Sequence, residues 1–436
     1  MKSTPPQTND AVARELDVSP SQARSILIVC FLLYMVNCMD RQVLSAVLQP
    51  MKLDLGLSDT QVGLIQTGFL LSIAILAFPI SYLVDRWSRR KAIGIMAIIW
   101  SVFTFVTGLG KSFWGVIVPR SLVGAGEAGF SAGGTAMIAA VYPHEARAKA
   151  MGIFNAAIPL GAGLGVMVGG TISVHFGGWR SPFFVFALPG LVLGILAFFL
   201  KDYKTVENID EHGQIRGLFK SGFSLYKIPT MRWVYLSNAM MTTTAYSFLT
   251  WGPAYVMRVQ GIDEEKAGLL IGILSLMAII GAPLGGWLAD TWNRSHPKGR
   301  IYMPLLSLVC MSIFFLLSIY FELKGIGLVF GFMLGVALVL PIPAYGALTQ
   351  DVVTPDRKGM AFGMNTFSMY VLGGGWAPIV IGYVSDLFGG GARGLKWALM
   401  IASVGGILAA LALFVASKTY LEDLNKVRGY RLEADN

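Results

Sequence analysis

The sequence predicts an all-α membrane protein with twelve transmembrane helices in two pseudo-symmetric six-helix bundles, and three observations lead to this prediction. Of the 436 residues, 55% are hydrophobic and 14% are charged, whereas about a quarter are charged in soluble domains. The apolar residues form long runs, and about 20 apolar residues in a helix cross a bilayer core. One long polar stretch divides these runs into two sets of six.

Each of the twelve runs is about 17 to 27 residues long, as a spanning helix requires. They begin near Ser25, Thr60, Ala92, Phe113, Ala148, Arg180, Trp233, Ala267, Ile301, Gly325, Gly359 and Lys396. Residues 1–24 are polar and lack a signal-peptide pattern, so we expect a disordered tail there. A first bundle over 25–200, a linker over 201–232, a second bundle over 233–416 and a C-terminal tail over 417–436 complete the expected organisation.

The formal net charge of +9 comes largely from loops on one side of the expected membrane. "DRWSRRK", "PHEARAK", "PDRK" and the linker are basic, whereas the loops on the other side are short and poor in Lys and Arg. This bias places both termini and the linker in the cytoplasm of a multi-pass plasma (inner) membrane protein. It explains the basic charge without a nucleic-acid partner.

Enzymatic and cofactor motifs are missing from the sequence. It contains no P-loop, no H-E-x-x-H and no nucleophile elbow. Cys30, Cys38 and Cys310 fall within spans without metal or disulfide spacing, and the four histidines are dispersed. We therefore expect no enzyme, no cofactor and no metal site.

A weak internal repeat relates the two halves. "SYLVDRWSR" at 81–89 follows the second span, and "GWLADTWNR" at 286–294 follows the eighth. Repeats at corresponding positions of two hydrophobic halves are typical of transporters whose site lies between the halves.

These motifs also carry a family resemblance. The segment around Asp85 resembles the major facilitator signature G-x-x-x-D-R-x-x-R-R, with Ser81 in place of its glycine. More narrowly, "NCMDR", "PRSLVGAGEAGFSAG" and "FNAAIPLGAGLG" resemble the spinster family, as does "TWGPAYVMR" in the second half. The resemblance implies a bacterial member of the family with the major facilitator fold. It also implies a monomer that exports lysophospholipids or sphingosine phosphate with proton coupling.

Four charged residues lie deep in the first half. Asp40 is about 15 residues, or roughly 22 Å, from the start of its span, and a charge at that depth indicates a functional site. Arg41 follows it, and Arg120 and Glu127 lie seven residues apart on nearly one face of the fourth span. We expect these four to form one network, with the choice of pairs open. A purely structural ion pair is the alternative.

This network predicts a route to coupled transport. An arginine favours the ionised form of a neighbouring acid, and its planar donor fork binds phosphate or carboxylate. If a substrate headgroup engages Arg41 or Arg120, the released Asp40 or Glu127 takes up a proton. We therefore assign proton coupling to Asp40 and Glu127. The residues assigned to substrate binding are Arg41, Arg120, Asn37, Asn155 and Ser247, the last three for their place in family-like segments.

The second half has no Asp, Glu, Lys or Arg in the interior of its spans. A cavity with charge on one wall and neutral residues on the other suits an amphipathic molecule. For any single Ser, Thr or Asn there, an interhelical hydrogen bond is the alternative.

Two further groups of residues suggest movement between the halves. We assign Asp85, Arg86, Arg89 and Asp290, at the turns after the second and eighth spans, to a cytoplasmic gate, with a simple topology anchor as the alternative. Gly161, Gly165 and Gly169 form a small-residue face for close helix approach, which serves packing or gating.

The sequence thus predicts a secondary transporter of an amphipathic anionic lipid that works by alternating access and is coupled to protons. A proton-coupled symporter of a small organic anion, such as a sugar acid, is the first alternative. A non-transporting membrane receptor is the second.

Overall fold

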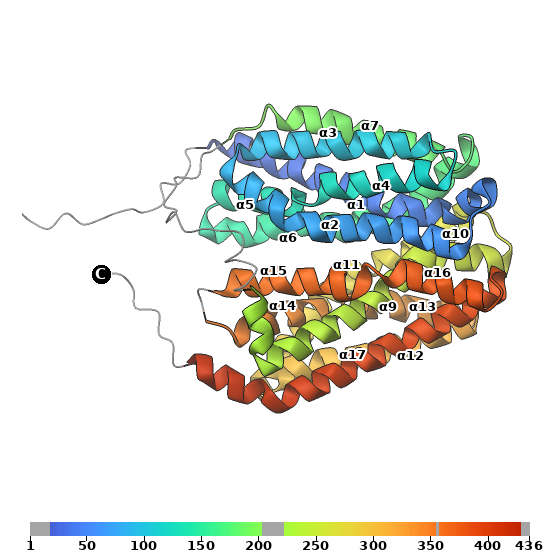
Figure 1. The fold of residues 1–436 in the computed structure, drawn as a ribbon. Helices are drawn as coiled ribbons and strands as arrows, with labels where there is room; N and C mark the ends of the chain where they lie inside the picture. Colours follow the sequence, from blue (N-terminus) through green and yellow to red (C-terminus); the bar gives the residue numbers. More distant parts are fainter. Residues whose placement is uncertain (1–17, 203–221, 355–356, 429–436) are drawn as a thin grey trace, which may run out of the picture.

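The computed structural model describes residues 18–202, 222–354 and 357–428, and these are helical, with no strand among them. Nine helical stretches in these ranges are long and apolar enough to cross a membrane, and Ser181–Ala197 is a shorter apolar helix. Grouping helices that continue one another gives twelve paths through the molecule, six in each half (Figure 1). The chain is therefore an all-α protein of two six-helix bundles.

The first half contains six paths. Four are single long helices and the sixth is shorter, while the fourth path breaks at Ala128–Gly129 into α4 and α5. In chain order these are α1 (Pro20–Leu55), α2 (Asp59–Arg86), α3 (Arg89–Gly108), α4 (Phe113–Glu127) with α5 (Phe130–Val141), α6 (His144–His175) and α7 (Ser181–Ala197).

The second half is broken more often. Its paths are α9 (Pro229–Gln260), preceded by the short turn η1 (Leu225–Lys227), α10 (Glu264–Leu276) with α11 (Ala278–Ser295), α12 (Gly299–Tyr320), α13 (Ile326–Ala337) with α14 (Ile342–Asp351), α15 (Lys358–Met369) with η3 (Tyr370–Gly374) and α16 (Ala377–Leu387), and α17 (Gly391–Arg428). Element η3 is a π-helix, a feature found frequently at functional sites.

Local sequence explains where the first helices begin and end. Ser19 and Gln22 form a capping box at the start of α1, and Ser58 and Gln61 do the same for α2. Each box satisfies backbone N–H groups that the first helical turn leaves without partners. Gly56, at a φ of 61°, ends α1 in the left-handed conformation that glycine adopts without strain.

The helix bounds differ from the expected domain limits at both ends of the chain. Helix α1 begins at Pro20, within the stretch assigned to the N-terminal tail, and α17 continues to Arg428, beyond residue 416. Residues 1–17, 203–221 and 429–436 of the expected tails and linker lie outside the described residues. Helix α1 starts and α17 ends at the same end of the molecule, called here the terminal end; the opposite end is the distal end (Figure 1).

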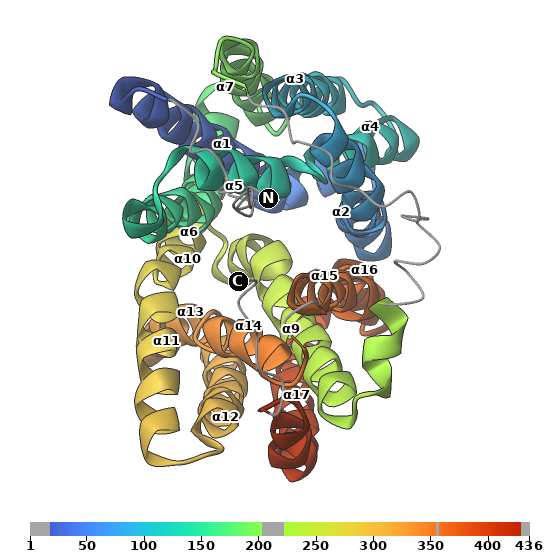
Figure 2. The same ribbon diagram turned by 90° about the vertical axis from the view of Figure 1, so that its left-hand side faces the viewer.

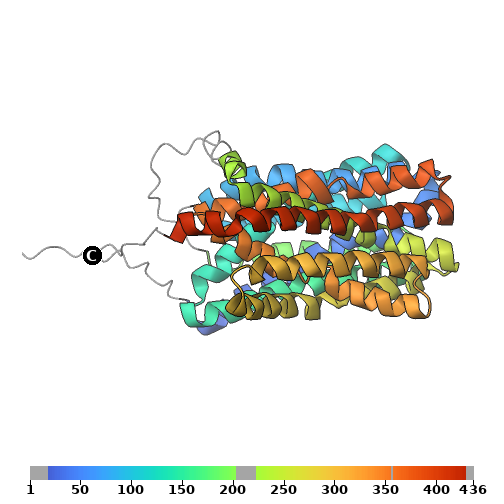
Figure 3. The same cartoon turned by 90° about the horizontal axis from the view of Figure 1, so that it is seen from below.

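Glycines allow helices of the two halves to meet closely. A Cβ on Gly163 of α6 would lie 2.9 Å from the carbonyl oxygen of Gly272 in α10, and one on Gly63 of α2 would lie 2.3 Å from that of Pro378 in α16. Figure 2, viewed from the terminal end, shows α6 beside α10 and α2 beside α16. The two halves therefore contact each other along these two helix pairs. Figure 3 shows the same helices from below.

The glycine face of α6 predicted from the sequence contacts a different helix. Cβ atoms on Gly161 and Gly165 would lie 2.4 and 2.6 Å from the carbonyl oxygens of Met35 and Met39 in α1. This face packs within the first half, whereas Gly163 and Gly170 face α10.

Candidate functional site

Asp40 and Arg120 form an ion pair inside the first half. One guanidinium nitrogen of Arg120 donates to Asp40 Oδ1 at 3.1 Å and another to the Asp40 carbonyl oxygen at 2.6 Å. Thr104 of α3 donates to Asp40 Oδ2 at 2.5 Å, and the guanidinium lies 4.4 Å from the ring centre of Phe69. Arg120 is fully buried and Asp40 is 2% exposed. This pair links α1, α3 and α4 and is closed to solvent.

Arg41 and Glu127 form a second ion pair with a different environment. Arg41 Nε donates to Glu127 Oε2 at 2.8 Å, and 22% of the Arg41 side chain is exposed while that of Glu127 is buried. Glu127 is the last residue of α4, where the fourth path breaks. No hydrogen bond joins the two pairs among the described residues, so the four charges form two direct ion pairs, with Glu127 still within electrostatic range of Asp40 and Arg120.

Buried polar atoms without partners lie beside the second pair. Glu127 Oε1 and both amide atoms of Asn37 have no hydrogen-bond partner within the described structure. Asn37 lies four residues before Arg41, on the same face of α1. Because an unpaired buried polar group costs about 1–3 kcal/mol, these atoms mark a place where a ligand or water is expected.

Two tyrosines of the second half face this region. The π-helix η3 begins with Tyr370, whose hydroxyl lies 3.1 Å from that of Tyr246 in α9. Tyr370 packs into the buried cluster of the first half and, like Tyr34, is within electrostatic range of the Arg41 guanidinium. Neither Tyr246 nor Tyr370 stands out in the sequence. A lone Tyr in an apolar run gives no signal, and the "GGG" that follows Tyr370 is the only local indication of the irregular helix.

The other proposed substrate-binding residues lie in different surroundings. Asn155 in α6 is exposed. Ser247 in α9 is fully buried, and its hydroxyl donates to the Thr243 carbonyl oxygen at 2.7 Å within the same helix. Asn155 is therefore accessible to a ligand, whereas Ser247 is not.

Polar side chains of the second half form hydrogen bonds to one another across helices or to backbone carbonyl oxygens. Asn238 donates to Asn365 at 3.0 Å, and the hydroxyls of Ser237 and Tyr345 lie 2.6 Å apart. The bonds between side chains of different helices fit the alternative stated above, in which these polar residues join helices and do not bind substrate.

The residues assigned to a gate at the terminal end are only partly described. Asp85 and Arg86 belong to α2, but their side chains lie outside the described residues. Arg89 is 7% exposed. Asp290 is 3.5 Å from Arg300, which bonds more closely to Asp351 at 2.9 Å. Because α11, α12 and α14 all belong to the second half, the Asp290 contact lies within one half.

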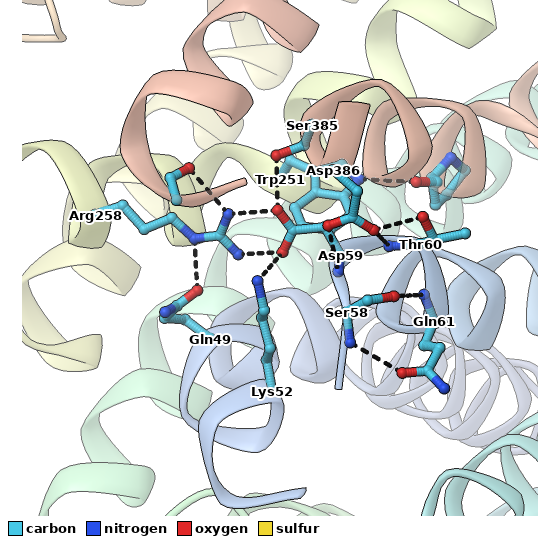
Figure 4. Close-up of polar contacts among 12 residues, drawn as sticks. Gln49, Lys52, Ser58, Asp59, Thr60, Gln61, Trp251, Arg258, Ser385 and Asp386 are labelled. Atoms are coloured by element: carbon cyan, nitrogen blue, oxygen red, sulfur yellow. Dashed lines mark hydrogen bonds and ion pairs between the residues drawn. The ribbon is translucent and has the colours of Figure 1, made fainter. Parts of the chain in front are cut away.

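The distal end holds a polar cluster that the sequence analysis did not predict (Figure 4). The carboxylate of Asp59, at the start of α2, is fully buried and accepts two hydrogen bonds from the guanidinium of Arg258 in α9, at 2.6 and 2.8 Å. Lys52 and Ser385 donate to the same carboxylate at 2.5 and 2.6 Å. Arg258 also donates to Gln49 of α1 at 2.6 Å.

A second carboxylate in this cluster caps a helix of the opposite half. Asp386 of α16 accepts hydrogen bonds from the backbone nitrogens of Asp59 and Thr60 at 3.1 and 2.8 Å. An acidic side chain at a helix N-terminus is stabilised by the free N–H groups and by the helix dipole. Asp59 and Asp386 therefore fasten the two halves together at the distal end. Neither residue could be identified from the sequence, because a charged residue at the end of a span resembles an ordinary loop charge.

Comparison with known proteins places the fold in a family. The family model for the major facilitator superfamily matches residues 30–378. The chain belongs to the major facilitator superfamily. Its members are transporters, so the superfamily accounts for the two helical halves and makes the chain a multi-pass integral membrane protein.

Within the superfamily, relatives point to the spinster type. Protein spinster homolog 1 of Xenopus tropicalis is 25% identical, with 93% of this chain and 82% of the relative covered. The sphingosine-1-phosphate transporter SPNS2 of the same frog is 26% identical, over 90% and 81%. The hexuronate transporter of Bacillus subtilis is 27% identical, over 89% and 93%.

A solved structure has the same arrangement of helices. A bacterial homologue of the human lysosomal transporter spinster, in an inward-facing and occupied conformation, superposes with a TM-score of 0.82 at 22% identity, covering 93% of this chain and 99% of that chain. The resemblance of this major facilitator protein to the spinster family, first visible in its motifs, is confirmed.

Proposed function

We propose that this spinster-type transporter moves an amphipathic anionic lipid, such as a lysophospholipid or a sphingoid phosphate, by alternating access coupled to protons. One observation carries the proposal: Arg41 is partly exposed and bonded to a buried Glu127 that has one unpartnered oxygen. An anionic headgroup that draws Arg41 away leaves Glu127 without its counter-charge, and a buried carboxylate without a counter-charge favours the protonated form. Substrate and proton then use the same arginine in turn.

The two ion pairs take different roles in this proposal. Arg41 and Glu127 form the exchanging pair, with Asn37 as an additional hydrogen-bonding group for the substrate. Asp40 and Arg120, closed to solvent and held by Thr104, position α1 against α4. A role for Asp40 in proton uptake then requires that the transport cycle first opens its pair.

The distal cluster supplies one of the two barriers that alternating access needs. Its ion pairs and hydrogen bonds close the route between the halves at that end while Arg41 remains partly exposed. We propose that the terminal end is cytoplasmic, in agreement with its basic loops. A cysteine introduced at exposed Lys149 then stays unlabelled by an impermeant maleimide added to intact cells, and rapid labelling would reverse the orientation.

A symporter of a small organic anion is the second candidate, because one relative is a hexuronate transporter. Both candidates use Arg41 to bind an anion, but only the lipid uses the neutral and aromatic second-half wall. Proteoliposomes with an imposed pH gradient decide between them: we expect uptake or exchange of lysophospholipid and none of glucuronate. Proton-driven glucuronate uptake without lysophospholipid exchange would favour the sugar acid.

A further inference from the structure

A groove of about 650 Å³ opens on the outer face of the second half, away from the ion pairs of the first half. It lies between α11, α12 and α13, and its lining is almost entirely apolar. Residues that define it are Leu288, Leu306, Cys310, Phe314, Met333 and Leu340. Leu306 is 53% and Met333 43% exposed, so the groove faces the surroundings of the protein.

The break in the tenth path explains why this groove exists. Cβ atoms on Gly281 and Gly285 of α11 would lie 2.4 and 2.0 Å from the carbonyl oxygens of Val336 and Leu340, next to the turn that separates α13 from α14. The first part of α11 is thus pressed against this turn. Farther along, one face of α11 lines the groove, and α11 lies at the edge of the molecule in Figure 2.

The groove has the depth of one bilayer leaflet. Along α12 its lining runs from Met303 to Phe314, which is about 16 Å at 1.5 Å per residue. That is about half of a hydrocarbon core roughly 30 Å thick. Because α12 begins and α11 ends at the terminal end, most of the groove lies in the leaflet at that end.

Aromatic and basic residues lie where α11 ends and α12 begins, next to the Trp292 and Ser295 end of the groove lining. The ring of Tyr302 lies 6.4 Å from that of Trp292 and 5.3 Å from that of His296, and Trp and Tyr are enriched at the level of lipid headgroups. Arg294 is exposed and Lys298 half-exposed, and neither forms an ion pair with another described residue. Arg89, the counterpart of Arg294 in the sequence repeat, is by contrast buried.

We propose that this groove binds an anionic phospholipid of the terminal-end leaflet, with an acyl chain along α12 and the headgroup phosphate on Arg294 and Lys298. Charge complementarity selects the lipid, because basic pockets between transmembrane helices bind anionic headgroups. The site is separate from the transport site, since it is formed by three helices of one half and includes none of the four buried charges.

Cysteine 310 provides a direct test, because it is half-exposed in the groove while Cys30 and Cys38 are buried. The purified protein is held in an uncharged detergent and treated with N-ethylmaleimide while dioleoyl-phosphatidylglycerol or dioleoyl-phosphatidylcholine is added. We expect phosphatidylglycerol to slow modification of Cys310 and phosphatidylcholine to do so only at much higher concentration. Equal protection by the two lipids, or none by phosphatidylglycerol, would overturn the proposal.

Variants locate the headgroup. Each basic residue near an anionic lipid contributes about fivefold in affinity, so Arg294→Ala with Lys298→Ala raises the phosphatidylglycerol concentration for half protection about thirtyfold. The matched control is Arg147→Ala with Lys149→Ala, which removes two exposed charges from the start of α6 in the other half and leaves protection unchanged.

Native mass spectrometry of Cys310→Trp, which fills the groove, should show loss of the retained phosphatidylglycerol. Retention equal to that of the unsubstituted protein contradicts the assignment.

Discussion

At the scale of single residues, the two arginines of the central site differ in what they hold. Arg120 is fully buried and donates two hydrogen bonds to Asp40, whereas Arg41 is partly exposed and donates one hydrogen bond to its acidic partner Glu127. Removing one member of a buried ion pair costs about 3–5 kcal/mol, because the other charge is left unpaired. Loss of Arg120 therefore affects stability first, and loss of Arg41 affects binding first.

We expect Arg120→Ala to lower the midpoint of thermal unfolding strongly, measured by tryptophan fluorescence in detergent. Arg41→Ala, with a more accessible partner, should unfold at a temperature closer to that of the unsubstituted protein and yet lose affinity for a lysophospholipid by at least about tenfold, as charge-assisted bonds worth about 1.5–3 kcal/mol require. Unchanged lipid affinity in Arg41→Ala would remove the headgroup assignment.

The sequence was informative about these residues because depth in the membrane makes charge conspicuous. Asp40, Arg41, Arg120 and Glu127 stand in apolar runs, and the structure brings them together. Their pairing could not be read from spacing, since it depends on how α1 rotates against α4. Ser247 and Tyr370 could not be judged from the sequence. A hydroxyl that bonds within its own helix, as in Ser247, and a ring that begins a π-helix, as in Tyr370, give no pattern that separates them from other polar or aromatic residues in apolar runs.

At the scale of helices, the distal cluster acts as a fastening between the halves. Arg258 of α9 bonds to α1 and α2, and its loss breaks the bidentate contact to Asp59. Thr67 of α2, which accepts a hydrogen bond from the backbone nitrogen of Ile379, reports on the same interface because it is 1% exposed.

We predict that Arg258→Ala makes a cysteine at position 67 react several-fold faster with a maleimide, in a Cys310→Ser background. The matched control is Arg180→Ala, which removes a 2.8 Å ion pair to Asp54 at the same end but within the first half. Equal reactivity in Arg258→Ala and Arg180→Ala would show that the cluster does not hold the distal end closed.

The two glycine faces of α6 make a further prediction. Gly161→Ala inserts a methyl against α1 and should lower thermal stability, since overpacking costs about 1–3 kcal/mol. Gly163→Ala inserts it against α10 and should instead raise reactivity of the cysteine at position 67, with a smaller loss of stability. If both substitutions lower stability equally and neither alters reactivity, α6 serves packing alone.

At the scale of the whole molecule, the sequence was sufficient for the two-bundle fold because hydrophobic runs and loop charge reflect the bilayer itself. It was less informative about breaks within paths. The Pro-rich "LPIP" at 340–343 indicates the turn before α14, but the break after Glu127 has no proline and lies in the small-residue stretch "GAGEAG", which is also compatible with a continuous helix. The contacts between halves were least predictable, because Asp59 and Asp386 are 327 residues apart in sequence and each stands at an ordinary helix end.

The central claim is that an anionic headgroup and a proton compete for Arg41, with Glu127 as the acid. The most direct measurement is proton uptake by the purified protein, followed with a pH indicator in weak buffer, as lysophospholipid is added. We predict net uptake approaching one proton per bound lipid in the unsubstituted protein and none in Glu127→Gln, while Asp40→Asn retains it if the variant remains folded. Lipid binding without proton uptake in the unsubstituted protein, or uptake that persists fully in Glu127→Gln, would contradict the claim.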